Sequence, residues 1–152
     1  MLTASQLRPP TALSLPAALS AREERALAGA SRLYALRRRV NADASATSAV
    51  TVYVVLYALT DPGGSPRDQL AEPQALAHAR GYVVHARFCD TAGGTRPGWA
   101  TAQRAIAEGR AHGIIASSRA AIGGSDQQYE FDLHWLARHR AALWLVRPEP
   151  AL

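Results

Sequence analysis

The sequence predicts a three-layer α/β domain with a four-stranded parallel sheet, preceded by an N-terminal helix. Two observations support this prediction. Short runs of β-branched and aromatic residues alternate with longer amphipathic segments from about residue 49 onward. Glycine, proline or serine stands at most of the boundaries between them. Strands that alternate with helices imply right-handed crossovers and therefore a parallel sheet.

Four segments are expected as strands. The first, residues 49–58 (AVTVYVVLYA), is apolar on both faces, which is typical of a buried parallel strand. The other three are residues 82–88, 114–117 and 142–146.

Three helices are expected between the strands, over residues 69–80, 98–110 and 126–140. Gly81 provides a C-terminal stop for the first helix, and Pro97 opens the second. A proline inside a helix removes a hydrogen bond and costs roughly 3 kcal/mol. Because Pro73 falls inside the first segment, that helix is expected either to begin near Pro73 or to bend there.

The chain is expected to divide into residues 1–46, a flexible leader with an Arg-rich helix, and residues 47–152, the α/β domain. Residues 1–19 contain three prolines and no sustained periodicity, which indicates a flexible leader. Its order of charge and apolar residues does not fit a secretory signal. The segment that follows this leader is expected to form a helix that is only loosely attached to the α/β domain.

That helix is expected over residues 22–40, with residues 41–48 as a linker. Ser20 and Glu23 form a capping-box pattern at its start. All 17 basic residues of the chain are arginine, and the first 46 residues carry most of the net charge of +5. The run Arg37-Arg38-Arg39 is therefore a candidate contact for a nucleic-acid backbone. The simpler alternative is a solvated helix face.

Composition excludes several classes of protein. Charged residues at 19% and hydrophobic residues at 48% argue against a disordered chain. The longest apolar run, residues 49–59, is too short to cross a bilayer, so no membrane partner is expected. Cys89 is the single cysteine, which excludes an internal disulfide framework and favours the cytoplasm. The histidines and Cys89 lack a metal-ligand spacing, and neither a metal nor another cofactor is expected.

Five short motifs follow one another between residues 50 and 148: Tyr57-Ala58, Asp68-Gln69-Leu70, Ala79-Arg80-Gly81-Tyr82, Asp90 followed by Gly94-Thr95-Arg96-Pro97-Gly98-Trp99, and residues 107–113 (AEGRAHG). Their order and spacing resemble the N-terminal catalytic domain of serine recombinases, the resolvase and invertase family. This resemblance implies a resolvase-like, flavodoxin-like fold and a function connected with DNA recombination.

The resemblance also implies a catalytic chemistry that the sequence does not fully carry. In that family a serine attacks a DNA phosphate while arginines neutralise the developing charge. The position of the nucleophile falls on Thr60 or on a deleted residue, and its neighbouring arginine falls on Leu59 or Ala58. Arg96 clearly remains, whereas Arg119 stands one position early.

An aspartate and two further arginines of the family fall on Ala120, Ala121 and Gly124. Each lost guanidinium costs about 10²-fold or more in rate. Thr60, Arg96 and Arg119 are therefore expected to be vestiges of an active site without strand-cleaving activity. We also expect a truncated relative, without the long helix and DNA-binding domain that follow in the family. The expected role is that of a remnant or accessory whose partners are DNA or a recombinase-like protein.

A second hypothesis concerns three similar loops that follow strands. In each, paired glycines stand beside a hydroxyl: Gly63-Gly64-Ser65, Gly93-Gly94-Thr95 and Gly123-Gly124-Ser125. Loops at the carboxyl edge of a parallel sheet often bind ligands, and their N–H groups can hold an anion. The alternative is ordinary turns followed by helix N-caps. The sequence thus leaves open an α/β module that binds an anion or a nucleotide.

Overall fold

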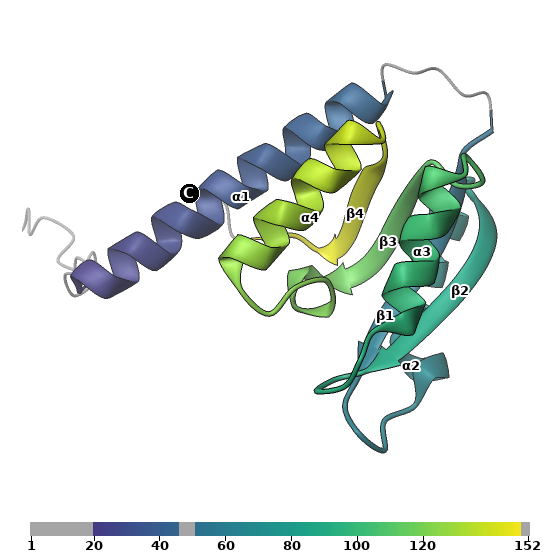
Figure 1. Ribbon diagram of the computed structural model, residues 1–152, viewed down its shortest axis with the longest axis horizontal. Coiled ribbons are helices and arrows are strands. Elements are labelled where there is room, and N and C mark those ends of the chain that lie inside the picture. The colour runs from purple at the N-terminus through teal and green to yellow at the C-terminus, as the bar shows by residue number, and fades with distance from the viewer. Residues whose placement is uncertain (1–19, 46–50, 150–152) are drawn as a thin grey trace, which may run out of the picture.

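The computed structural model describes residues 20–45 and 51–149 as a parallel α/β structure (Figure 1). The strands are β1 (Tyr53–Thr60), β2 (Val83–Thr91), β3 (Gly113–Ser118) and β4 (Ala142–Arg147), in the order β2-β1-β3-β4. The helices are α1 (Ala21–Ser45), α2 (Pro66–Ala79), α3 (Pro97–Ala107) and α4 (Asp126–Arg138), with a short 3-10 turn, η2 (Arg119–Ala121). All three strand pairs are parallel. The predicted fold class is therefore confirmed, while the predicted leader, residues 1–19, lies outside the described residues.

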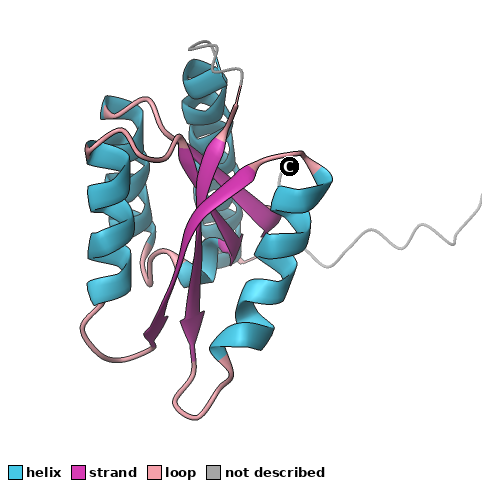
Figure 2. Ribbon diagram, turned by 90° about the vertical axis from the view of Figure 1, so that its right-hand side faces the viewer, coloured by secondary structure: helices cyan, strands magenta, loops and turns pink. Residues whose placement is uncertain are grey.

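Helices cover both faces of the sheet (Figure 2). On one face, Val55, Tyr57 and Ile114 belong to a core that also contains residues of α1, α3 and α4. On the other face, Val54, Leu56 and Ile115 pack against α2. The central strand β1 is thus buried on both sides, as its apolar sequence predicts.

Helix α2 begins earlier than predicted and contains Pro73 without a break. The hydroxyl of Ser65 caps the helix by accepting a hydrogen bond from the Asp68 N–H at 3.4 Å, so the helix begins at Pro66. Pro73 has no N–H for the carbonyl of Gln69, four residues earlier. The Ser117 hydroxyl donates to that carbonyl at 3.4 Å, which partly compensates for the missing bond.

Helix α1 is longer and more firmly packed than the sequence suggests. The predicted linker over residues 41–48 is helical as far as Ser45. The side chain of Asn41 bonds to both the N–H and the carbonyl of Leu143, each at 2.8 Å, and so pairs with the β4 backbone. Leu33 and Val40 are buried in the core. The expectation of a loosely attached helix is therefore wrong.

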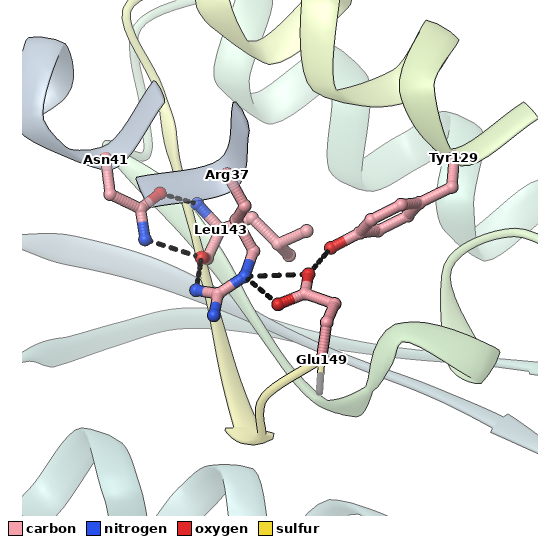
Figure 3. Close-up of polar contacts among 5 residues, drawn as sticks. All are labelled: Arg37, Asn41, Tyr129, Leu143 and Glu149. Carbon is pink, nitrogen blue, oxygen red and sulfur yellow. Dashed lines mark hydrogen bonds and ion pairs between the residues drawn. The ribbon is translucent and has the colours of Figure 1, made fainter. Parts of the chain in front are cut away.

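Arg37 points into the molecule rather than toward solvent (Figure 3). Its Nε lies 2.9 Å from both carboxylate oxygens of Glu149, and the hydroxyl of Tyr129 donates to the same carboxylate. Burial raises the pKa of Tyr129 well above its usual range, and the Glu149 carboxylate adds to the shift. Because Arg37 is only 7% exposed and its guanidinium is already paired, it is not available to a nucleic acid, unlike Arg38 and Arg39, which are exposed.

Candidate functional site

Two of the motifs that carry the recombinase resemblance, those of Tyr57 and of Asp90 to Trp99, meet around the carboxylate of Asp90, near the end of β2. This carboxylate accepts hydrogen bonds from the Tyr57 hydroxyl at 2.8 Å and from the N–H groups of Gly98 at 2.8 Å and Trp99 at 2.9 Å. The carboxyl group of Asp90 thus lies at the N-terminus of α3, where the helix dipole favours negative charge. A Cβ on Gly98 would lie 3.0 Å from Asp90 Oδ1, so the close approach requires glycine.

Arg96 completes this cluster from the residue before α3. Its Nε and Nη2 both donate to the Tyr57 hydroxyl at 3.1 Å, and Nη2 also donates to the carbonyl of Ala121 at 2.9 Å. Nη1 donates to the carbonyl of Ile122. Burial raises the pKa of Tyr57 well above its usual range, and the bond to Asp90 adds to the shift, so the phenol stays neutral. The guanidinium therefore ties η2 to the sheet.

Thr60 ends β1 with its side chain buried. Its hydroxyl donates to the carbonyl of Asp90 at 3.4 Å, and the Cys89 thiol lies 3.9 Å from the Thr60 hydroxyl oxygen. Within residues 20–45 and 51–149, no arginine lies within hydrogen-bond distance of this hydroxyl. No hydrogen bond joins Thr60, Arg96 and Arg119 to one another among the described residues, and their role as vestiges of an active site stays a prediction.

Two further arginines of this edge are paired with acids. Arg119 forms an ion pair with Asp126, and its guanidinium lies 5.0 Å from the centre of the Tyr129 ring. Arg147, which ends β4, lies 2.6 Å from Glu72 on α2. These contacts hold the guanidinium groups against neighbouring elements.

Two of the three Gly-Gly loops serve as turns with helix caps. Ser65 caps α2, and the Ser125 hydroxyl accepts from the Gln128 N–H at 3.1 Å to cap α4. Gly63 and Gly93 have φ of 83° and 84°, which glycine adopts readily. The turn-and-cap interpretation accounts for these residues. Anion binding stays a prediction for all three loops, that is, for Gly63, Gly64, Ser65, Gly93, Gly94, Thr95, Gly123, Gly124 and Ser125.

Two adjoining cavities lie at the carboxyl edge of the sheet. The first, of about 300 Å³, lies where β1 and β3 diverge and is lined by residues that include Asp61, Gln69, Ser118 and Arg147. The second, of about 410 Å³, is lined by Arg119, Gly123, Gly124 and Glu149 among others. Strands β1 and β3 connect to helices on opposite faces, which makes this the topological switch point where such sheets bind ligands.

Asp132 on α4 is a further buried acid that sequence reasoning missed. It is 2% exposed, and its Oδ2 has no hydrogen-bond partner among the described residues. Its Oδ1 accepts from the Gln128 side chain at 3.3 Å. Burial raises the pKa of Asp132 to about 6, against the opposing effects of Gln128 and the Arg96 charge. Its position on the buried stripe of α4, beside Leu133, is the one sequence signal that could have found it.

Among the residues that the structure describes, no three His, Cys, Asp or Glu side chains gather as the ligands of a metal ion would. None of the helices in this described part of the chain combines the length and hydropathy needed to cross a membrane.

Solved structures share this fold. The C-terminal catalytic domain of ISC1926 TnpA, an IS607-like serine recombinase, matches with a TM-score of 0.56 and 15% identity over 63% of this chain and 70% of that one. The N-terminal catalytic domain of TP901-1 integrase matches with a TM-score of 0.55 and 16% identity over 62% and 76%. The chain has the fold of a serine recombinase catalytic domain. A third match, the first ORF in transposon ISC1904 from Sulfolobus solfataricus P2, has a TM-score of 0.50 and 16% identity over 65% and 70%.

The resemblance to serine recombinases is thus confirmed at the level of the fold. No protein-family model matches the sequence, and no curated protein gives a significant match. The catalytic domain is the C-terminal one in ISC1926 TnpA and the N-terminal one in TP901-1 integrase. The sequence motifs suggested a likeness to N-terminal catalytic domains. The fold matches catalytic domains at either end of the recombinase chain.

Proposed function

We propose that this recombinase-like domain does not cleave DNA and instead has an accessory role, in which it binds DNA or a recombinase partner. One observation carries the proposal: Thr60 is 4% exposed, and its hydroxyl donates to a backbone carbonyl and has no arginine within hydrogen-bond distance in the described chain. A phosphodiester needs access to the nucleophile and cations around its oxygens. The burial of Thr60 and the absence of a hydrogen-bonded arginine in the described chain support the proposal on both points.

The contacts of Arg96 support the same conclusion. Its guanidinium donates to Tyr57 and to the carbonyls of Ala121 and Ile122. Turning it toward a phosphate would leave these acceptors unpaired in a partly buried site, which costs about 1–3 kcal/mol for each group. Arg96 therefore positions η2 and α3 rather than a substrate.

A covalent-adduct assay tests the absence of cleavage. The full chain is incubated with supercoiled plasmid DNA, denatured, and examined for protein linked to DNA, with an active serine recombinase as the positive control. We expect no adduct from the native protein and none from Thr60→Ser, which restores the nucleophile of the family but no arginine. An adduct that forms with the native protein and disappears in Thr60→Ala would overturn the proposal.

The accessory role predicts weak, salt-dependent retention on DNA through the exposed arginines of α1. Arg38 and Arg39 are exposed, whereas Arg37 is buried against Glu149. Deletion of the helix would remove Leu33 and Val40 from the core and is not a usable test. The double substitution Arg38→Ala/Arg39→Ala is expected to reduce retention and its salt dependence. Retention unchanged by this substitution would contradict a contact through α1.

The second candidate function, binding of an anion or nucleotide, is favoured by the 410 Å³ cavity. Gly123 and Gly124 line it together with Arg119 and Arg147. Its volume falls within the range of small-molecule sites. Titration with inorganic phosphate and with a nucleotide tests this candidate by amide chemical shifts. Shifts confined to residues 118–124 and 147–149, and lost in Arg147→Ala, would support it, and their absence would exclude it.

A further inference from the structure

A row of arginines crosses the amino edge of the sheet, at the opposite end from Thr60. Arg80 stands three residues before β2, Arg110 three before β3 and Arg140 two before β4, and all three are exposed. Neighbouring strands lie about 5 Å apart, so the strand starts from β2 to β4 span roughly 15 Å. The carboxyl ends of the helices meet the same edge (Figure 1).

The two edges of the sheet differ in charge. The exposed arginines of the α/β body at the amino edge are Arg80, Arg104, Arg110, Arg138 and Arg140, and the acids near them are Glu108, which pairs with Arg110 at 2.5 Å, and Asp43. Around the carboxyl edge the exposed acids are Asp61, Asp68, Glu72 and Asp126, and they face Arg67, Arg119 and Arg147. A polyanion is therefore attracted to the amino edge.

Helix dipoles explain only some of these arginines. Arg104 and Arg138 lie in the last turns of α3 and α4, where a cation is favourable in any helix. Arg140 needs another explanation, because its backbone is left-handed, with φ of 50°. The corresponding residues after α2 and α3 are Gly81, with φ of 70°, and Gly109, with φ of 74°.

An arginine at a position that favours glycine carries a backbone strain that glycine would relieve. Arg140 is the one non-glycine residue with positive φ in the described chain. Its side chain is exposed and forms no ion pair among the described residues, so it does not compensate the strain by an internal contact. When the side chain of a strained residue makes no stabilising internal contact, the strain points to a functional use of that side chain.

An exposed aromatic ring stands within the same row. Tyr53 begins β1 between the starts of β2 and β3, is 41% exposed, and its ring centre lies 5.9 Å from that of His112. Its register partner Val83 is 44% exposed. These two side chains and Phe131 are the large hydrophobic residues that the described chain exposes, so two of the three lie at this edge.

We propose that the amino edge of the sheet binds single-stranded nucleic acid, with Arg80 and Arg140 on phosphates and Tyr53 stacked on a base. Cations that follow the backbone and an aromatic ring for an unpaired base are the combination that single strands require. A duplex offers phosphates but no free base face for Tyr53. The surface is separate from the Thr60 site, so this inference stands or falls independently of the proposed function.

Fluorescence anisotropy of the full chain with a labelled oligothymidylate, at several salt concentrations, tests the proposal. Arg140→Gly relieves the strained backbone, so its melting temperature is expected to stay the same or rise while affinity falls about three- to tenfold. The slope of log Kd against log salt is expected to fall by about 0.7. The matched control is Arg67→Ala, an exposed arginine near the opposite edge, with an expected change below about twofold.

Variants of the aromatic ring test base stacking. Tyr53→Leu is expected to weaken binding about fivefold or more, and Tyr53→Phe, which keeps the ring, is expected to bind like the native protein. An oligouridylate arm distinguishes RNA from DNA as the source of the strand, and preference for either supports the proposal. Three results would each overturn the proposal. The first is an equal loss of affinity in Arg140→Gly and Arg67→Ala, and the second is equal affinity for a duplex together with no effect of Tyr53→Leu. The third is no binding of the oligonucleotide at low salt.

Discussion

Arg37 of α1 and Glu149, 112 positions further along the chain, form an ion pair inside the protein (Figure 3). Their side chains are 9% and 0% exposed, and Arg37 Nη1 also donates to the carbonyl of Leu143 at 3.2 Å. The Tyr129 hydroxyl completes the contacts of the carboxylate. One ion pair therefore joins α1, α4, β4 and the segment after β4.

Arg37→Ala is expected to lower the free energy of unfolding by about 3–5 kcal/mol, because it leaves the Glu149 carboxylate buried without its cation. Urea denaturation measures the change. The control Arg38→Ala removes an exposed arginine from the next position and is expected to change stability by no more than about 0.5 kcal/mol. The double variant Arg37→Met/Glu149→Leu should recover most of the loss, since it removes both charges together. A loss below about 1 kcal/mol in Arg37→Ala would contradict a structural role for the pair.

The alternation of strands and helices could be predicted from the sequence because β1, β3 and β4 each contain a short apolar run, whereas β2 carries His85, Arg87 and Asp90. The packing of α1 could not. Its stripe of apolar residues is loose, and Arg37 occupies a core position that hydrophobicity patterns assign to a surface. Its partner Glu149 lies near the other end of the chain, where no local pattern connects the two.

The site was predictable only in part, for a similar reason. Asp90 and Arg96 stood out through motif order, but their hydrogen bonds to Tyr57 depend on how α3 packs on β1. Hydroxyls beside glycines were ambiguous between anion binding and capping, and the structure uses Ser65 and Ser125 as caps. Burial of a polar residue such as Asp132 leaves no signature in composition. Such features arise from tertiary contacts that no short segment encodes.

Gly113→Ala is expected to destabilise the protein by about 1–3 kcal/mol, since a well-packed core does not accept an added methyl. A Cβ at this position would lie 2.5 Å from the Trp144 ring and 2.7 Å from the carbonyl of Ala142. The matched control is Gly124→Ala, which would meet nothing within 4 Å and needs no positive φ. Thermal unfolding of the two variants checks the difference. Equal melting temperatures would show that Trp144 moves aside without cost.

Tyr57→Phe is expected to cost about 1–3 kcal/mol, because it leaves Asp90 without one donor and Arg96 without an acceptor in the interior. The expected loss is larger than that of Tyr34→Phe, a change on a partly exposed ring of α1. Chemical denaturation gives both values. Greater exchange of the amide hydrogens of residues 119–122 in Tyr57→Phe would further indicate that Arg96 had lost its hold on η2. A neutral Tyr57→Phe would mean that water replaces the hydroxyl.

Asp132 makes the stability of the protein depend on pH in a direction opposite to that of most carboxylates. Burial raises its pKa from 3.8 to about 6 in the folded state, so the folded protein holds the proton more tightly than the unfolded chain. Its favourable contribution is complete below about pH 4 and is lost as the pH rises through about 6. Above that pH the charged, partly unpaired carboxylate carries a penalty of up to about 3 kcal/mol.

Asp132→Asn should therefore leave stability nearly unchanged at acidic pH and raise it by up to about 3 kcal/mol at neutral pH. The amide stays neutral and its oxygen can still accept the hydrogen bond from Gln128. Urea denaturation of both proteins at several pH values between about 4 and 8 follows the difference. The control Asp61→Asn, in an exposed loop, should show no such rise, because that carboxylate is hydrated in both states. A gain for Asp132→Asn that is independent of pH would mean that Asp132 is not the titrating group.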